Sequence, residues 1–275
     1  MFDFLKMHGL GNDFVIIDLR ENILDLSDNL VRAVCDRRTG IGCDQLILLS
    51  NPSTSEATVF MGIRNADGSE AGACGNATRC VADMLMRKIQ TDFVKIETEA
   101  GVLECWRSGN DIRVKLGPPT FEWRDIPLSK PCDTMSLPIS LSKYAQLKDP
   151  ITLSVGNPHV VFFLEPLDGL NMNEVGPVIE NDPLFPERVN VNFAVLAGES
   201  KIMLRVWERG SGATLACGTG ACATAVAAMK RGLINGKVEV EQAGGNLLVE
   251  WAGGPESPIY MTGKATQVFT GTYNA

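Results

Sequence analysis

Short apolar runs bounded by turn-forming residues dominate the chain. Many of them alternate apolar and polar positions, which is the period of a strand with one buried face. The predicted strands cover residues 14–18, 45–49, 58–61, 94–98, 102–105, 112–116, 151–155, 159–164, 191–195, 202–207, 237–241 and 247–251. Short turns at 100–101 and 244–246 join neighbouring runs, as in antiparallel hairpins. The pattern indicates a protein built mostly from antiparallel strands.

Helical periodicity is confined to a few segments. Residues 30–34 follow Ser27 and Asp28, which can cap a short amphipathic helix. Residues 76–89 repeat apolar side chains at helical spacing, and residues 219–229 are apolar on every face, which is typical of a helix surrounded by protein. Helices that stand alone among hairpins predict an α+β fold.

A boundary between two halves of similar make-up is predicted near the middle of the chain. Gly117-Pro118-Pro119 ends the preceding strand and stiffens the segment after it. We therefore expect one domain over residues 1–118 and a second over residues 119–263.

Composition and charge exclude several classes of function. The chain has 275 residues, of which 45% are hydrophobic and 21% charged, as in ordinary globular proteins. The formal charge of −8 argues against nucleic acid or an anionic membrane as a partner, because both attract a basic surface. No apolar run is long enough to span a bilayer, and charged residues interrupt the first 22 positions, unlike a secretory signal. We expect a cytoplasmic protein.

One short motif occurs once in each half. Ala73-Cys74-Gly75-Asn76-Ala77 is similar to Ala216-Cys217-Gly218-Thr219-Gly220, and a predicted helix with a second cysteine comes after each copy. A repeat of this kind suggests two related domains that face each other across a pseudo-twofold axis.

Cys74 and Cys217 each lie where a loop becomes a helix. Unpaired backbone N–H groups and the positive end of the helix dipole then lie close to the sulfur. That setting is expected to lower the thiol pKa, and the same N–H groups can bind a carboxylate. Cys80 and Cys222 lie further inside their helices and are expected to be structural.

Two thiols with a carboxylate between them suggest proton transfer at the carbon next to that carboxylate. One thiolate removes the α-proton from one face, and the opposite thiol delivers a proton to the other face. Such a pair inverts a stereocentre without a cofactor.

The chain resembles the diaminopimelate epimerase family in a series of motifs that extends over almost its whole length. They are 6–14 (KMHGLGNDF), 65–70 (NADGSE), 74–76 (CGN), 156–159 (GNPH), 188–190 (RVN), 207–210 (WERG), 214–223 (TLACGTGACA) and 261–263 (MTG). The resemblance implies an isomerase that interconverts LL- and meso-2,6-diaminopimelate, in lysine and peptidoglycan precursor biosynthesis, with no cofactor and no metal.

The resemblance also implies an architecture. The family has two pseudo-symmetric domains, each a barrel-like, mostly antiparallel sheet around a central helix, with the active site in the cleft between them. Residues 264–275 are expected to return to the first domain, and a homodimer is expected.

The family's site residues transfer to matching positions of this chain. Cys74 and Cys217 match the catalytic acid–base pair, and His159 and Glu208 match residues that tune the thiols. The matching substrate contacts are Asn12, Gln45, Asn65, Gly75, Asn76, Asn157, Asn190, Glu208, Arg209, Gly218 and Thr219. Arg209 could pair with a substrate carboxylate, the strong term in such recognition.

Some positions depart from the family pattern. Ala77 stands where Gly is common, Ala213 stands where Glu is common, and Gly72-Ala73 is smaller than the usual pair. Ala77 improves helix propensity by up to ~1 kcal/mol over Gly. Ala213 removes one possible hydrogen bond.

The sequence leaves three other functions open. A proline or hydroxyproline racemase, or another cofactor-independent racemase, would share the chemistry. A dinucleotide-binding oxidoreductase is suggested by residues 218–223, which fit G-x-G-x-x-A, with Glu239 about 20 residues further on. A metal or redox module could use Cys74, Cys80, Cys217 and Cys222, although their spacing does not suit a zinc knuckle.

Overall fold

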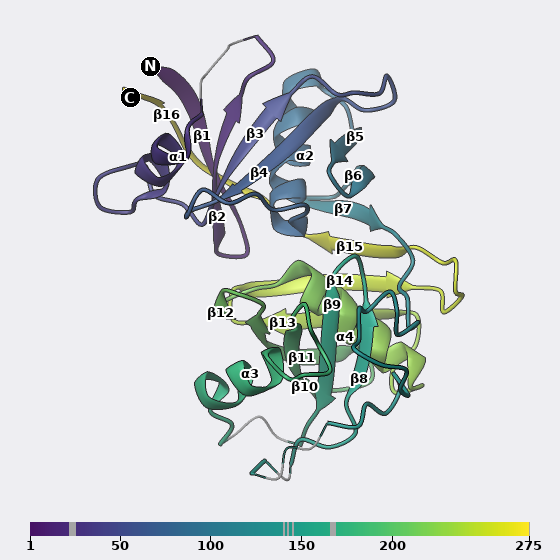
Figure 1. Ribbon diagram of the computed structural model, residues 1–275. Helices are drawn as coiled ribbons and strands as arrows, with labels where there is room; N and C mark the ends of the chain where they lie inside the picture. Colours follow the sequence, from purple (N-terminus) through teal and green to yellow (C-terminus); the bar gives the residue numbers. More distant parts are fainter. Residues whose placement is uncertain (22–25, 140, 142, 145, 166–168, 275) are drawn as a thin grey trace. The chain divides into compact units, whose positions relative to one another are not determined.

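The computed structural model describes residues 1–275 except 22–25, 140, 142, 145, 166–168 and 275. The chain divides into two compact units (Figure 1). Unit 1 comprises Met1–Lys115 and Thr262–Ala275, and unit 2 comprises Leu116–Met261. The chain returns from unit 2 to unit 1 within β15 (Ile259–Gly263). That these units are epimerase domains stays a prediction.

The sheet of unit 1 has the strand order β16-β1-β2-β3-β4-β5-β6-β7. The strands are β1 (Phe2–Gly9), β2 (Asn12–Asp18), β3 (Gln45–Ser50), β4 (Val59–Asn65), β5 (Phe93–Thr98), β6 (Gly101–Ser108), β7 (Asp111–Leu116) and β16 (Thr266–Tyr273). Most neighbours are antiparallel, but β2–β3 and β4–β5 are parallel. Helix α1 (Asp28–Cys35) connects the first parallel pair, and α2 (Gly75–Ile89) connects the second.

The sheet of unit 2 is built in the same way, in the order β14-β13-β11-β10-β9-β8, with β12 paired to β11. Its strands are β8 (Ile151–Ser154), β9 (Pro158–Phe163), β10 (Asn190–Leu196), β11 (Lys201–Glu208), β12 (Gly212–Thr214), β13 (Lys237–Gln242) and β14 (Gly245–Trp251). The pairs β9–β10 and β11–β13 are parallel. Helices α3 (Met172–Glu180) and α4 (Gly218–Lys230) lie in the connections between them.

The α+β class and the mostly antiparallel pairing are confirmed, but the picture of helices that stand apart from crossovers was wrong. Among the described elements, each helix lies in the connection between two parallel strands. Parallel neighbours need a long crossover, because a tight turn can join only antiparallel strands. The sheets are therefore mixed.

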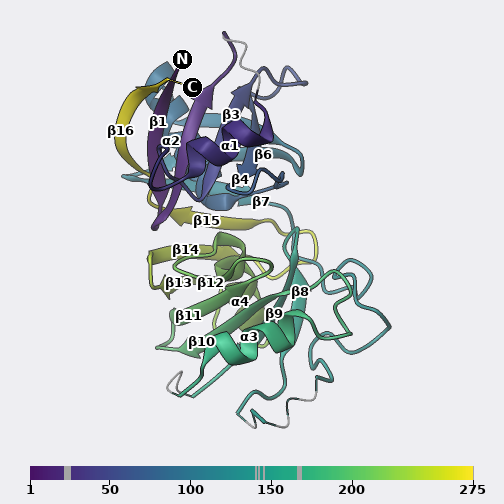
Figure 2. The same cartoon turned by 60° about the vertical axis from the view of Figure 1, so that its left-hand side comes forward.

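One helix in each unit is packed against several strands (Figures 1 and 2). Helix α2 contacts β1, β2, β5 and β6, and α4 contacts β8–β11, β13 and β14. Helix α4 is buried on nearly every side, with Ala221, Ala223 and Val226 at 0% exposure, as its uniformly apolar sequence predicts. These buried helices position the cysteines, since each begins directly after one.

Several elements were not predicted from the sequence. Strand β16 has mostly exposed side chains, so it lacks the alternation that marks a half-buried strand. Helix α3 contains Gly176 and Pro177, residues that usually interrupt helices. Gly176 is required there, because a Cβ atom at this position would come within 2.4 Å of the Trp207 ring. Strands β1, β12 and β15 were also missed. Within the described residues, no helix is long and apolar enough to cross a membrane.

Candidate active site

Cys74 is the N-cap residue of α2, with an extended backbone. Its half-buried thiol donates to Asn12 Oδ1 at a distance of 3.7 Å, and Asn76 Nδ2 donates to the same oxygen at 3.2 Å. Three of the predicted site residues of unit 1 therefore lie in direct contact, brought together by the start of β2 and the first turn of α2.

A network of charged side chains next to Asn12 fixes the orientation of its amide. Asp44 accepts a hydrogen bond from Asn12 Nδ2 at 2.9 Å, and Arg37 pairs with both Asp44 and Asp13. Burial alone would raise the pKa of Asp13, but hydrogen bonds from Arg37 and Lys6 hold it well below its usual range. The Asn12 amide oxygen is thereby turned toward the Cys74 thiol.

Gln45 and Asn65 form a second polar pair in unit 1. They lie opposite each other on β3 and β4, and Gln45 Nε2 donates to Asn65 Oδ1 at 2.9 Å. Asn65 Nδ2 donates onward to Ser69 Oγ at 3.0 Å. The register of these antiparallel strands therefore joins two predicted substrate contacts.

Arg79 was not predicted as part of the site. It is fully buried, and its Nη2 donates to Asn76 Oδ1 at 2.6 Å. Its guanidinium also donates to the carbonyl oxygens of Gly75 and Lys264, both at 3.3 Å. Arg79 thus orients the Asn76 amide and ties the first turn of α2 to the segment before β16. The i, i+3 spacing from Asn76 was the available signal in the sequence.

Cys217 is the N-cap residue of α4 and is almost fully buried. Its Sγ accepts from the backbone N–H of Gly220 at 3.3 Å and lies 3.5 Å from Thr219 Oγ1. Its own backbone N–H donates to Gln242 Oε1 at 2.8 Å. The placement of both cysteines at helix N-termini, as expected from the repeat, is confirmed.

The expectation that the helix terminus lowers the pKa of Cys217 was wrong. Burial raises the pKa of this thiol well above its usual range, and the Glu208 carboxylate raises it further. Hydrogen bonds from Thr219 and Gly220 oppose this shift without reversing it. Loss of hydration destabilises the thiolate more than the hydrogen bonds from the first turn of α4 stabilise it. Cys217 is therefore a thiol at neutral pH.

Glu208 ends β11 and accepts a hydrogen bond from Thr214 Oγ1 on the neighbouring β12. Because its carboxylate acts on the Cys217 thiol, the structure places Glu208 beside that sulfur. Ala213 lies on the exposed side of β12, opposite Trp207.

The remaining predicted residues of unit 2 meet at the ends of β9 and β10. His159 Nε2 lies 3.0 Å from Asn157 Oδ1, and Asn157 Nδ2 donates to Thr219 Oγ1 at 3.3 Å. Asn190 Nδ2 donates to the Pro158 carbonyl at 2.9 Å. Burial lowers the pKa of His159 to about 3, and the nearby Arg209 lowers it too. The ring is therefore neutral at physiological pH.

Arg209 is held through both its backbone and its side chain. Its N–H donates to Asn190 Oδ1 at 3.0 Å, and Nη1 donates to the Glu187 carbonyl at 3.1 Å. A carbonyl partner leaves the guanidinium charge available for a carboxylate.

Gln242 and Asn192 were missed, although both are buried and contact site residues. No local motif marked them, since they approach from neighbouring strands of the sheet.

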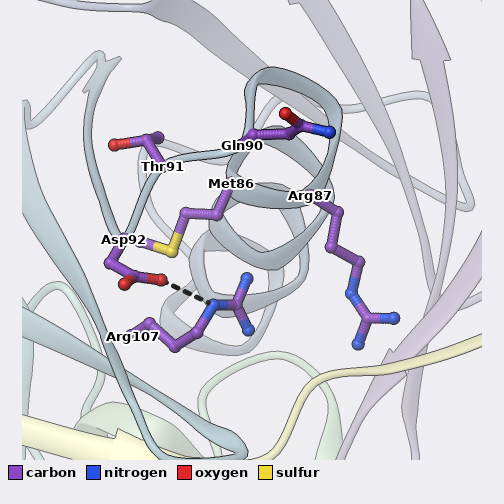
Figure 3. A pocket seen from close by; sticks show the side chains of 6 residues that line it. All are labelled: Met86, Arg87, Gln90, Thr91, Asp92 and Arg107. Carbon is purple, nitrogen blue, oxygen red and sulfur yellow. Dashed lines mark ion pairs between the residues drawn. The ribbon is translucent and has the colours of Figure 1, made fainter.

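Two surface cavities lie elsewhere in unit 1. One, of about 330 Å³, lies at the end of α2 beside the Arg107–Asp92 ion pair (Figure 3). The other, of about 390 Å³, is lined by residues of β1, β2, α2 and β16. Neither cavity is lined by a residue predicted to bind substrate.

The structure does not support a metal site at the cysteines or a dinucleotide-binding role for the glycine-rich segment. Among the described residues, no group of three His, Cys, Asp or Glu side chains could hold a metal. Cys80 is buried in α2, and burial raises its pKa to about 12, as for a structural thiol. The glycine-rich segment at 218–223 begins α4, where the N–H of Gly220 binds the Cys217 sulfur.

Solved structures of two other proteins superpose well on this chain, although their sequences are only weakly similar to it. A probable proline racemase from Agrobacterium radiobacter K84 matches with a TM-score of 0.73 at 15% identity, covering 100% of this chain and 93% of that one. A hydroxyproline epimerase from Agrobacterium vitis matches with a TM-score of 0.71 at 14% identity, covering 98% and 91%. At this identity the likeness establishes the shared two-domain α+β fold.

Comparison of sequences is more specific. Diaminopimelate epimerase of Sphingopyxis alaskensis is 52% identical over 268 residues, covering 98% of this chain and 96% of the relative. Diaminopimelate epimerase of Rhizorhabdus wittichii is 50% identical over 268 residues, covering 97% and 93%. The family profile of diaminopimelate epimerase matches residues 4–122 and 151–268. This chain belongs to the diaminopimelate epimerase family.

Proposed function

We propose that the protein interconverts LL- and meso-2,6-diaminopimelate by proton transfer at one α-carbon. Family membership supports the substrate. The observation that carries the mechanism is that the buried helix of each unit begins directly after a cysteine, Cys74 in one and Cys217 in the other.

The two cysteines act as a base and an acid. One thiolate takes the α-proton, and the electron pair left on carbon delocalises into the neighbouring carboxylate. The opposite thiol then donates its proton to the other face and becomes the thiolate of the next, reverse turnover. Because burial keeps Cys217 protonated at neutral pH, Cys217 is suited to begin as the proton donor.

Backbone donors bind the reacting carboxylate. The first N–H groups of a helix have no intrahelical partner, and they point toward any anion at the N-terminus. Gly218 and Thr219 occupy these positions in α4, and Gly75 and Asn76 occupy them in α2. These donors stabilise the negative charge that develops as the α-proton leaves.

The other predicted contacts suit the distal end of a long, doubly zwitterionic substrate. Arg209 supplies positive charge, and the amides of Asn65, Asn157 and Asn190 supply donors and acceptors. Two further residues act on the Cys217 thiol in this proposal. Glu208 changes the pKa of the thiol directly, and His159 acts on it through Asn157.

The proposal extends to the organisation of the enzyme. We assign residues 1–118 with 264–275 and residues 119–263 as the two epimerase domains, each of which contributes one cysteine to the reaction. We infer that the enzyme is a cytoplasmic homodimer and needs no cofactor. Dialysed enzyme should be active without pyridoxal phosphate, metal or nucleotide, and sedimentation should give twice the chain mass.

Isotope incorporation from deuterated water tests the two-thiol reaction. Starting from the pure LL isomer at initial rates, deuterium should enter the meso product while recovered LL substrate stays unlabelled, because each thiol carries its own proton. Equal early labelling of both pools would contradict two separate bases.

A substrate panel tests the choice of amino acid. Diaminopimelate should turn over while proline and hydroxyproline, the substrates suggested by the shared fold, should not. Racemisation of proline without turnover of diaminopimelate would overturn the proposal.

A further inference from the structure

Asn192 lies at the centre of a buried polar cluster in unit 2. It belongs to β10, is 0% exposed, and contacts the His159 side chain of the parallel neighbour β9. Its Nδ2 is 3.1 Å from the Val160 carbonyl, 3.4 Å from the Asn190 carbonyl and 3.1 Å from His159 Nδ1.

The surroundings determine which way the Asn192 amide points. Carbonyl oxygens only accept hydrogen bonds, so the nitrogen must face the two carbonyls. Oδ1 then points toward the first turn of α4, where a Cβ atom on Gly220 would lie 2.7 Å from it. A glycine is therefore needed at position 220 for α4 to begin so close to this amide.

This orientation determines the tautomer of His159. Asn192 Nδ2 carries two hydrogens and lies near three possible acceptors, so these hydrogens are shared among them. A proton on His159 Nδ1 would point at this donor group, so Nδ1 accepts and carries no proton. Since the buried ring is neutral, its single proton lies on Nε2.

Each further hydrogen bond takes its direction from the one before. His159 Nε2–H donates to Asn157 Oδ1, which leaves Asn157 Nδ2 to donate to Thr219 Oγ1. The Thr219 oxygen accepts there, so its own proton is available for Cys217 Sγ, 3.5 Å away. The chain of donors runs from Asn192 to the sulfur.

We propose that Asn192 is a positioning residue whose amide holds His159 in the Nε2–H tautomer and thereby directs the Thr219 hydroxyl proton to the Cys217 sulfur. The inference rests on the proposed function only in treating Cys217 as catalytic. With the proton on Nδ1, Asn157 would reverse, and Thr219 would donate to Asn157 instead. The Cys217 thiolate would then lose a donor that stabilises it.

Nitrogen-15 NMR of histidine-labelled protein tests the tautomer in the unaltered enzyme. The chain contains 2 histidines, so a His8→Gln variant assigns the signals. We expect Nε2 protonated and Nδ1 unprotonated at neutral pH. A proton on Nδ1 would overturn the inference whatever the enzyme's activity.

Variants test the effect on the sulfur. In Asn192→Asp the carboxylate can only accept, so the His159 proton should move to Nδ1. Alkylation of Cys217 by iodoacetamide near pH 8, read by peptide mass, should slow roughly tenfold, the effect of one lost hydrogen bond to a charged group. Asn246→Asp adds the same charge at an exposed position of β14 and should change neither readout.

Thr219→Val covers the case in which Asn192→Asp does not fold. It should keep the Nε2–H tautomer and slow alkylation of Cys217 to a similar extent. Retention of the proton on His159 Nε2 in Asn192→Asp, or unchanged alkylation in a folded Asn192→Asp or Thr219→Val variant, would refute the proposal. If both readouts behave as expected and diaminopimelate is not turned over, the proposed function fails and this inference stands.

Discussion

The backbone N–H of Cys217 is bound by the side chain of Gln242, whose Oε1 accepts it at 2.8 Å in a buried position. Gln242 is the last residue of β13, so this bond joins the N-cap of α4 to the central sheet of unit 2. Among the described residues, Gln242 Nε2 has no hydrogen-bond partner. The side chain therefore keeps a buried, unpaired donor while it holds the cysteine.

Gln242→Met should lower both stability and turnover. Methionine has a similar shape but leaves the buried Cys217 N–H without an acceptor, which costs about 1–3 kcal/mol. Denaturant titration should show the loss in the free energy of unfolding, and kcat should fall because the sulfur is held less firmly. Gln146→Met, at an exposed position, should behave as wild type. Equal stability and kcat in all three proteins would contradict this role.

Cys74→Ala and Cys217→Ala should each abolish epimerisation, because removal of either thiol leaves an acid without a base or the reverse. The loss should be at least the ~10²–10⁴-fold that a general acid–base residue contributes. Cys80→Ala and Cys222→Ala are matched controls inside the same two helices, both at 0% exposure. They should cost only about 1–2 kcal/mol of stability. Substantial turnover by Cys74→Ala would disprove the two-thiol mechanism.

His159 should make the fold sensitive to mild acid. Its pKa is lowered from 6.5 to about 3, so the unfolded chain binds a proton in this interval while the folded protein does not. Stability should thus be complete above pH 6.5 and fall by up to about 1.4 kcal/mol per pH unit as the pH decreases toward 3. Measurements between pH 6.5 and about 5 avoid the titration of ordinary carboxylates.

The comparison of His159→Gln with His8→Gln isolates this effect. The His159 variant should lose the slope between these pH values, and the His8 variant should keep it. A slope that persists without His159 would assign the acid sensitivity to other groups.

Arg79→Lys should weaken the attachment of the C-terminal segment. A lysine ammonium has three donors on a flexible stem and cannot reproduce the planar arrangement that reaches Asn76, Gly75 and Lys264. We expect a lower melting temperature and faster amide exchange in β16. Arg87→Lys, on the exposed side of α2, is the control. Unaltered exchange in β16 would show that Arg79 does not hold this segment.

The sequence predicted those elements whose burial alternates or repeats at helical spacing. The strands at 94–98, 112–116 and 247–251 lie within β5, β7 and β14, because one face of each is buried. The sequence pattern does not predict strand β1, because Lys6 interrupts its apolar positions. Lys6 is nevertheless buried and pairs with Asp13. Burial of a lysine depends on a partner from another strand, which a local pattern does not show.

For the site, the sequence predicts where the two cysteines lie but not what surrounds them. The positions of Cys74 and Cys217 follow from a local rule, that a loop ends and a helix begins at each motif. Their surroundings depend on residues distant in sequence, such as Gln242 and Asn192. The pKa of Cys217 was misjudged for this reason, since the burial that raises it comes from the packing of the whole unit.

The pairing of β16 with β1 has a consequence for synthesis of the chain. The sequence of unit 2 is complete once Met261 has been added to the growing chain, whereas unit 1 still lacks Thr262–Ala275 at that moment. The half that is made first is therefore completed last. Until then the outer edge of β1 has no partner strand, and Arg79 lacks the Lys264 carbonyl to which it donates. The half that carries Cys74 therefore cannot complete its sheet until residues 262–275, which are made after the whole of unit 2, reach it.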